Sequence, residues 1–429
     1  MKNNIQKKLI YSALTVSSIL VTSSVNAAGF ALREQSTYGQ GSSFAGIAAG
    51  GDISGSFWNP ALVGEVETFE VQSGLSIINA ETEIESTGST NVIFQNLEDT
   101  GDVGGTTPVP YYYLANRINE QWTWGLSLTV PYGSATNADR GTRSQFVSLD
   151  AEILSLNLSP TITYQPSENL TFAAGLQFQY FDVEISRALP VGAEFGVFSA
   201  TDPVLGLEGD DIALGYTLGV TYQTGKTSLG AGFRSSVDHN LEGSLTIDDF
   251  GVNTDINLDL ETPWVLTLGW KQQLTDRLTL GITFERTNWS SVGTLPVISN
   301  ATGSIATVSG QPVAIPLNYV DTNFYSIGGD YQYSKHLTLR AGIGLDESTV
   351  TDTTRTSQLP DNDRLWVSFG LTTQLKHNFT FDFGYTYVSL TDEADINIVP
   401  GHSAFTGLPF TGVSDPEVHI LAFALTKQF

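Results

Sequence analysis

Histidine is the side chain best suited to acid–base chemistry near neutral pH, and the chain contains five of them. A hydrolase would need a histidine beside a nucleophilic serine or an acidic partner. None of the five lies in a motif that pairs it with a nucleophile; they are His239, His336, His377, His402 and His419. The sequence therefore predicts no catalytic residue and no enzyme activity.

Metal and cofactor chemistry has little support in the sequence. The chain contains no cysteine, which excludes thiolate ligands and a disulfide framework. Asp361, Asn362 and Asp363 place oxygen atoms in a tight loop, but they lack the spacing of a calcium loop and are typical of a turn. A phosphate-binding glycine loop is also missing. We therefore expect neither a metal nor a cofactor.

The charge balance argues against nucleic acid as a partner. The chain has 19 Lys and Arg against 45 Asp and Glu, a formal net charge of −26, and its basic residues form no cluster. Such a surface repels a polyanion. The acidic residues are interpreted as keeping exposed loops soluble, in preference to a specific cation-binding role.

The first 27 residues have the pattern of a secretory signal peptide. Lys2, Lys7 and Lys8 give a basic start, residues 9–21 are apolar, and residues 25–27 form a small-residue cleavage site. The apolar run is shorter than the roughly 20 residues that a spanning helix needs. We expect cleavage after Ala27 and export of the mature chain.

Strict two-residue alternation runs through the rest of the chain. In the stretch that begins at Phe379, bulky Phe and Tyr side chains alternate with Thr, Asp and Gly. This period puts the large apolar side chains on one face of a strand and the small or polar ones on the other, as in the wall of a water-facing lumen. About fourteen such strands can be placed. A closing strand ends at Phe429, a terminal aromatic that fits recognition by the barrel-assembly machinery.

The links between these strands alternate in length. Short turns fall near residues 119, 166, 224, 275, 334 and 376, and long links near 80–108, 132–150, 188–210, 247–256, 298–314, 350–362 and 398–416. Outer-membrane barrels sort their connections in this way, and soluble sandwiches have no reason to do so. The predicted fold is all-β, a fourteen-stranded antiparallel transmembrane β-barrel over residues 65–429.

Residues 28–64 lack strand alternation and are rich in Gly, Ala and Ser. A barrel of fourteen strands is too wide to be filled by its own side chains. We interpret this segment as an N-terminal plug (hatch) in the lumen. The alternatives are a disordered leader or a lid over the periplasmic mouth.

Several motifs in order resemble the FadL-type transporters of the outer membrane. The mature start resembles theirs in Ala28-Gly29-Phe30, Glu34, Gly41, Ala45-Gly46 and Asn59-Pro60-Ala61. Further matching blocks are "VPYG" from Val130, "GAGFRSSVDHNLEG" from Gly230, "ETPWVLTLGW" from Glu261, Trp289 and "LPDNDRLWVSFG" from Leu359. The resemblance implies a hatch-plugged barrel that takes hydrophobic molecules into an internal pocket and releases them sideways, where one strand kinks inward.

The resemblance also implies roles for single residues. Phe30 corresponds to the gating start of the hatch, unless it is only a packing aromatic, and Asn59, Pro60 and Ala61 to the motif that holds the hatch against the wall. Pro131, Tyr132 and Gly133 end the third strand and correspond to the kinked strand, although Pro131 is also compatible with a simple strand end.

The link from Leu189 to Leu207 is unusually apolar for an exposed loop. We expect an outer groove or, alternatively, a loop folded on itself; the residues concerned are Leu189, Val191, Phe195, Val197 and Phe198. Arg187 resembles a pocket arginine of fatty acid transporters. The second basic position of those proteins is occupied here by Val320 beside Asp321, as in importers of neutral hydrocarbons.

The sequence thus predicts an outer-membrane transporter of a Gram-negative bacterium that takes up long-chain fatty acids or similar hydrophobic ligands by passive binding. The alternatives are an importer of neutral hydrocarbons and a structural or receptor barrel for phage or adhesion. Outer-membrane lipid and lipopolysaccharide would surround the protein, and a closed ladder predicts a monomer.

Overall fold

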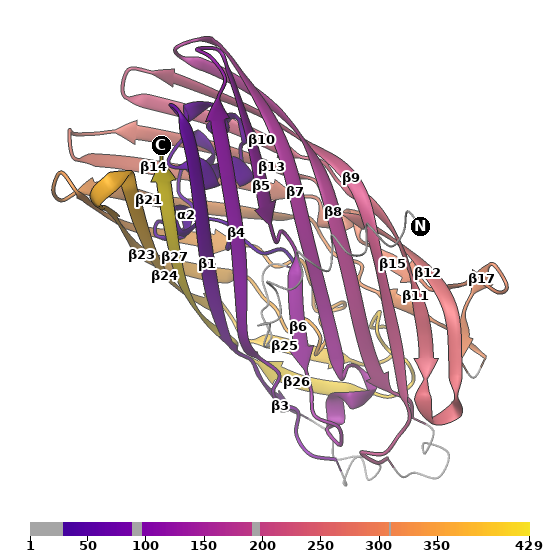
Figure 1. Ribbon diagram of the computed structural model, residues 1–429. Coiled ribbons are helices and arrows are strands. Elements are labelled where there is room, and N and C mark those ends of the chain that lie inside the picture. Colours follow the sequence, from indigo (N-terminus) through magenta and orange to yellow (C-terminus); the bar gives the residue numbers. More distant parts are fainter. Residues whose placement is uncertain (1–28, 88–96, 191–197, 309) are drawn as a thin grey trace.

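The computed structural model describes residues 29–87, 97–190, 198–308 and 310–429. Within these residues, a wall of fourteen antiparallel strands closes on itself, because the first strand pairs with both the second and the last (Figure 1). The fourteen-stranded barrel predicted from the sequence is confirmed. The predicted signal peptide lies outside the described residues.

Three wall strands are each broken into two segments. The wall consists of β1 (Phe69–Glu81), β4 (Gly105–Arg117), β5 (Trp122–Thr129) continued by β6 (Gly133–Asn137), β7 (Asp150–Ser167), β8 (Leu170–Ala188), β9 (Val204–Thr224), β10 (Thr227–Arg234) continued by β11 (Val237–Ile247), β12 (Val252–Thr262) continued by β13 (Val265–Gln273), β14 (Leu278–Thr287), β21 (Thr322–Gln332), β22 (Leu337–Asp346), β23 (Arg364–Gln374), β24 (Phe379–Leu390) and β27 (Glu417–Gln428).

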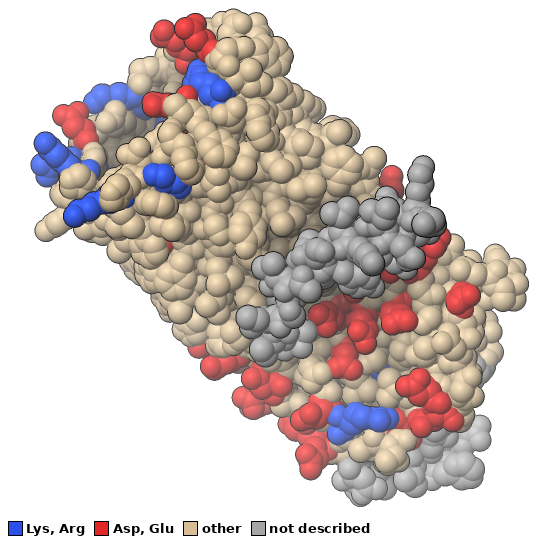
Figure 2. All heavy atoms as spheres, viewed as in Figure 1, with Lys and Arg blue, Asp and Glu red and all other residues tan. Residues whose placement is uncertain are grey.

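The two faces of the wall differ as the alternation requires. In β24, Asp382 and Thr386 are buried inside the barrel, and the aromatic side chains between them lie on the outer face. On the visible face, a broad band with few charges separates charged residues near the short turns from the acidic residues that gather at the opposite end (Figure 2). Such an apolar band is the part of an outer-membrane barrel that contacts lipid.

The predicted alternation of links holds with one correction. The short turns are those predicted, but the link expected to be long near 247–256 is a four-residue turn at 248–251 that contains η7 (Asp248–Phe250). The flanking strands β11 and β12 continue up to it, because their pairing extends to Ile247 and Val252. Another link is longer than expected: it spans residues 288–321 and includes η8 (Trp289–Ser291).

The long links carry small sheets of their own. The largest pairs β2 (Glu83–Ser86), β3 (Gly101–Asp102), β25 (Ala394–Ile398) and β26 (Phe410–Ser414). Two-stranded pairs are β15 (Thr294–Pro296) with β20 (Ala314–Pro316), and β18 (Thr307–Val308) with β19 (Gln311–Pro312); β16 (Ile298–Ser299) and β17 (Ser304–Ile305) extend the wall. Short helices are η5 (Arg143–Phe146) in a long link and η9 (Lys376–Asn378) in a short turn.

The residues before β1, called here the N-terminal segment (29–68), form short helices inside the barrel (Figure 1). They are α2 (Thr37–Gln40), η1 (Ile47–Ala49), η2 (Ile53–Phe57) and η3 (Pro60–Glu65). The segment is tied to the wall by hydrogen bonds, such as Thr37 N–H to the Tyr111 hydroxyl at 2.7 Å and Gly46 N–H to Thr283 Oγ1 at 2.8 Å. No helix among the described residues is long and apolar enough to cross a membrane.

Glycines in the wall let the backbone of this segment approach closely. A Cβ at Gly230 would lie 1.7 Å from the Ala48 carbonyl oxygen, and one at Gly232 would lie 1.8 Å from the Trp58 carbonyl oxygen. Side chains at these positions would push the segment away from the wall. The wall glycines therefore form a fitted seat for the N-terminal segment.

The third wall strand is interrupted between β5 and β6. Its pairing with β4 stops at Tyr112 and Leu128, and among the described residues β6 pairs with β7 but not with β4. The first part of β4, Gly105–Tyr111, therefore has an unpaired edge on this side. The sequence singled out Pro131, Tyr132 and Gly133 as a local break in a kinked strand or, alternatively, as a simple strand end. In the structure β5 ends at Thr129 and the strand resumes at Gly133 as β6.

Two prolines lie on this unpaired edge. Arg117 N–H points toward β1, to the Thr68 carbonyl, and Ile118 N–H points toward β5, to the Trp122 carbonyl. Because successive residues of a strand alternate in this direction, the backbone groups of Pro108 and Pro110 face the break. Proline has no N–H, so the edge lacks two of its donors.

Candidate ligand-binding site

The site is centred on an apolar cluster inside the barrel. It is built from lumen-facing residues of β8, β11 and β12 together with residues of the long links; its members include Phe30, Phe181, Leu241, Leu258, Trp289, Tyr319 and Leu359. Phe30 is 3% exposed, and its ring lies 4.8 Å from Trp289 and 5.6 Å from Tyr132 between centroids. The interior at this level is suited to an apolar molecule, not to water.

The start of the N-terminal segment occupies the break in the third strand. Leu32 N–H donates to the Pro131 carbonyl at 2.9 Å, and Gly133 N–H donates to the Phe30 carbonyl at 2.8 Å. The Gln35 amide donates to the Val130 carbonyl at 2.6 Å and accepts from Val130 N–H at 3.0 Å. The backbone groups that the break frees are therefore bonded by the N-terminal segment instead of by β4.

Tyr132 joins both sides of this junction. Its N–H donates to Ser155 Oγ at 2.8 Å, and its ring is buried against Phe30 in the apolar cluster. The structure therefore brings together Phe30, Pro131, Tyr132 and Gly133, which the sequence proposed for two separate roles. A movement of one of these elements must disturb the other.

Arg33 ties the N-terminal segment to two wall strands. Its guanidinium donates to Glu285 of β14 at 2.7 Å and to Asp346 of β22 at 3.3 Å, and it stacks over the Phe324 ring at 3.8 Å. Burial alone would lower the pKa of Arg33, but the two carboxylates together raise it above its ordinary value. Arg33 therefore stays charged in the lumen.

Glu34 is buried next to this ion pair, and no cation of the described residues forms a salt bridge with it. It is 2% exposed, and its Oε2 has no hydrogen-bond partner among the described residues. Burial raises the pKa of Glu34 to about 7, against smaller opposing effects of Arg33 and Arg364. Its carboxyl group therefore changes charge near neutral pH.

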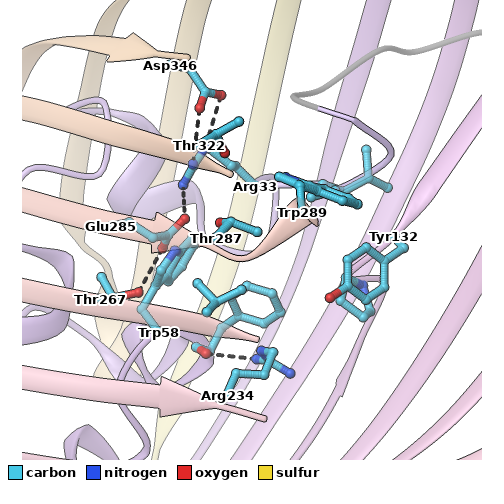
Figure 3. A pocket seen from close by; sticks show the side chains of 15 residues that line it. Arg33, Trp58, Tyr132, Arg234, Thr267, Glu285, Thr287, Trp289, Thr322 and Asp346 are labelled. Carbon is cyan, nitrogen blue, oxygen red and sulfur yellow. Dashed lines mark hydrogen bonds and ion pairs between the residues drawn. The ribbon is translucent and has the colours of Figure 1, made fainter. Parts of the chain in front are cut away.

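A small cavity lies between Arg33, the strand break and β10 (Figure 3). Its volume is about 50 Å³, and its lining includes Leu32, Phe57, Pro131, Tyr132, Arg234, Glu285 and Trp289. Figure 3 shows Arg234 on one side of it and Glu285, bonded to Arg33, on another. The cavity thus has an aromatic side, a cationic corner and a carboxylate that is already paired.

Arg187 lies at the end of β8, on the strand face that also carries Phe181. It is half-buried and is aligned with Leu205 of the apolar cluster. Val320, where a second base would be expected, is 40% exposed, and the neighbouring Asp321 pairs with Arg286 at 2.9 Å. A carboxylate near Arg187 would therefore meet one cation and not two.

The apolar link after β8 departs from the predicted exposed groove where it is described. Leu189 is buried in the apolar cluster, and Phe198 is 2% exposed and packs against Phe146 at 4.8 Å. These two residues fold inward, which was the alternative. Val191, Phe195 and Val197 lie outside the described residues.

Asn59, Pro60 and Ala61 begin the helix η3 at the wall. The Asn59 amide donates to the Ala48 carbonyl at 2.7 Å and to the Val220 carbonyl of β9 at 3.0 Å, and its oxygen accepts from Ala61 N–H at 3.1 Å. Asn59 thus caps a helix and bonds the wall at once. At the end of the chain, Phe429 N–H donates to the Phe69 carbonyl at 2.9 Å.

Sequence reasoning assigned no role to Arg33, Arg234 or Trp289. Trp289 and the "GAGFRSS" block were quoted as matching a family, but nothing in their spacing indicated that they share one cavity. A cation within the apolar start "AGFALREQ" was the available signal for Arg33. Its carboxylate partners lie 252 and 313 residues away, so no local pattern reveals the pair.

A closed barrel with a lipid-facing apolar wall, an apolar interior and a broken wall strand defines an outer-membrane β-barrel with an internal site for hydrophobic molecules. Comparison with known families agrees. The family model described as "Outer membrane protein transport protein (OMPP1/FadL/TodX)" matches residues 18–429. The chain belongs to this family of outer-membrane transport proteins of Gram-negative bacteria.

Individual relatives are distant. The chain is 25% identical over 417 residues to the "Long-chain fatty acid transport protein" of Escherichia coli, covering 88% of this chain and 90% of the relative. A Pseudomonas aeruginosa FadL homologue of known structure has a TM-score of 0.83 and 22% identity, covering 94% of this chain and all (100%) of the other. The Ralstonia pickettii toluene transporter TbuX has a TM-score of 0.67 and 17% identity, covering 92% and 99%.

Proposed function

We propose that this protein imports long-chain fatty acids across the outer membrane by passive, binding-driven diffusion. The observation that carries the proposal is the buried apolar cluster around Phe30 inside the barrel. Transferring an acyl chain from water into such a site favours binding by about 0.8 kcal/mol per CH₂. No energy source is needed if the ligand binds here and is then consumed on the periplasmic side.

The N-terminal segment acts in this proposal as a plug, and release is lateral. The plug role is supported by its seat on the wall glycines and by its many hydrogen bonds to the strands. Lateral release is supported by the missing pairing between β4 and β6 beside Phe30. A ligand that leaves through this break enters the bilayer without crossing the plug.

Import of a neutral hydrocarbon is the second candidate. It is favoured by Val320 in place of a second cation and by the likeness to a toluene transporter. A receptor barrel is disfavoured, because it would need no break in the wall. The effect of Arg187 on ligand affinity distinguishes the first two candidates, because a guanidinium strengthens the binding of a carboxylate but not that of a hydrocarbon.

The test is binding of a radiolabelled long-chain fatty acid to the purified protein, compared with an uncharged hydrocarbon of equal length. Preference for the acid that falls in Arg187→Ala supports fatty acid import with Arg187 as an anchor. Equal binding of both ligands, unchanged by the substitution, moves the function to hydrocarbon import. Binding of neither ligand contradicts both and supports a receptor.

A further inference from the structure

Arg234, at the end of β10, differs from the other buried arginines. Four arginines among the described residues are 9% exposed or less. Three of them pair with an aspartate: Arg340 with Asp330 at 2.8 Å, Arg355 with Asp352 at 3.0 Å and Arg364 with Asp361 at 2.5 Å. Arg234 has no such ion pair within the described part of the chain. A buried charge without a counterion is costly, so its presence calls for an anionic partner.

The guanidinium of Arg234 is held by neutral groups. Nη1 donates to Gln177 Oε1 of β8, and Nη2 donates to the Phe57 carbonyl at 2.8 Å. The Phe57 ring lies 4.2 Å below the guanidinium carbon. These contacts fix the orientation of the fork but do not neutralise its charge, so it can still bind a carboxylate.

The cavity beside Arg234 suits the head of an amphipathic acid. Its volume of about 50 Å³ is more than the roughly 10–15 Å³ that a cavity needs to hold one water, so the cavity has room for a small polar head but not for an acyl chain. The aromatic side of its lining, Tyr132 and Trp289, belongs to the apolar cluster. When the carboxylate of a fatty acid binds at Arg234, its acyl chain can therefore lie along that cluster, provided that the nearby Leu32 side chain is displaced.

The other charges that face this cavity are already paired. Glu285 accepts from Arg33 at 2.7 Å and from Thr267 Oγ1 at 2.7 Å, and Asp346 accepts from Arg33 at 3.3 Å. One cation between two carboxylates leaves this side of the cavity one charge negative, so it repels a second anion, and neither carboxylate forms a direct ion pair with Arg234. An entering carboxylate must therefore bind on the Arg234 side.

We propose that Arg234 is a second carboxylate-binding position, which a fatty acid occupies beside the break in the third strand before it leaves through the wall. The inference rests on the proposed function and adds a second station to it. Arg187 would hold the acid at the far end of the apolar cluster, and Arg234 would hold it next to Pro131 and Tyr132. Acid and alcohol of equal chain length would differ in affinity at this position.

The experiment measures binding of oleic acid and oleyl alcohol to the purified full-length protein at pH 8, by quenching of tryptophan fluorescence. Two variants remove the free charge in different ways. Arg234→Gln deletes it, and Gln177→Glu keeps the arginine but gives it an internal carboxylate. Gln179→Glu is the matched control, because it adds the same charge two residues along β8, where the side chain contacts His239 instead.

The variants are compared in an Arg187→Ala background, which removes the other proposed anchor. There we expect both test variants to bind the acid about ten- to hundredfold more weakly, the range of a hydrogen bond to a charged group, and the alcohol nearly as well as the Arg187→Ala parent does. Gln179→Glu should keep the preference for the acid. Heat modifiability on gels verifies that each barrel is folded, and Gln177→Glu remains informative if Arg234→Gln does not fold. Acid preference that survives in both variants overturns the role of Arg234 alone. A wild type that binds neither ligand overturns the proposed function itself.

Discussion

Arg33 is the residue whose replacement should release the start of the N-terminal segment. Arg33→Met would leave Glu285 and Asp346 buried without their cation, and it would remove the contact with the Phe324 ring. Breaking a buried ion pair in this way costs about 3–5 kcal/mol. A free-energy change of about 1.4 kcal/mol corresponds to a factor of ten in an equilibrium constant. The population of molecules in which the start of the N-terminal segment has left the wall, called here the undocked state, should therefore rise by roughly a hundredfold or more.

The assay uses the absence of cysteine from the chain. A single cysteine at Ala31 reports undocking through its rate of reaction with a maleimide, relative to a cysteine at the exposed Ala301. The control is Arg286→Met, which removes a partly exposed ion pair and should cost about 1 kcal/mol or less. Adding Glu285→Gln and Asp346→Asn to Arg33→Met should slow the labelling again, since no unpaired charge is left. An unchanged labelling rate in Arg33→Met would refute the ion-pair reasoning.

Three further outcomes are expected. The pKa of Glu34 is about 7 when the N-terminal segment is docked on the wall and about 4.5 when Glu34 is free, so the docked state binds more protons. Docking should therefore weaken as pH rises between these values, by up to about 3 kcal/mol. Glu34→Gln should flatten the pH dependence of the labelling ratio, and equal slopes in both proteins would contradict this. Gly230→Val should displace the segment from the Ala48 carbonyl and speed labelling, whereas Gly293→Ala, which meets no atom within 4 Å, should not. Phe30→Ala should reduce affinity for either ligand by opening the apolar cluster, and unaltered binding would exclude Phe30 from the ligand site.

Most of the wall could be predicted from sequence, because alternation and turn residues are local signals. Phe379 and its neighbours carry the period of two, and a short polar turn ends each hairpin on one side. The turn at 248–251 was missed because its acidic residues look like those of the long links, whereas cross-strand pairing carries β11 and β12 up to it. Local signals do not report how far a strand pair continues.

The site was harder to predict, because it depends on contacts between distant parts of the chain. Phe30 and Pro131 were singled out separately, yet they lie at one junction, where Leu32 bonds the Pro131 carbonyl. Arg234 gave no sequence signal, since an unpaired cation can be recognised only when its surroundings are known. Burial and charge balance, not residue type, identify it.

The edge of β4 at the broken strand has a further consequence for how the barrel behaves among its neighbours. A strand that keeps all its donors and acceptors is a template on which another strand can add, and in hydrocarbon each unmet donor costs several kcal/mol. Pro108 and Pro110 remove two donors from the β4 edge that faces the break. Without these donors, the edge of β4 cannot form a complete set of hydrogen bonds with the third strand of its own barrel. For the same reason it cannot form a complete set with a strand of a second molecule. The two prolines therefore keep the gap in the wall from closing and make this edge a poor template for pairing with another barrel.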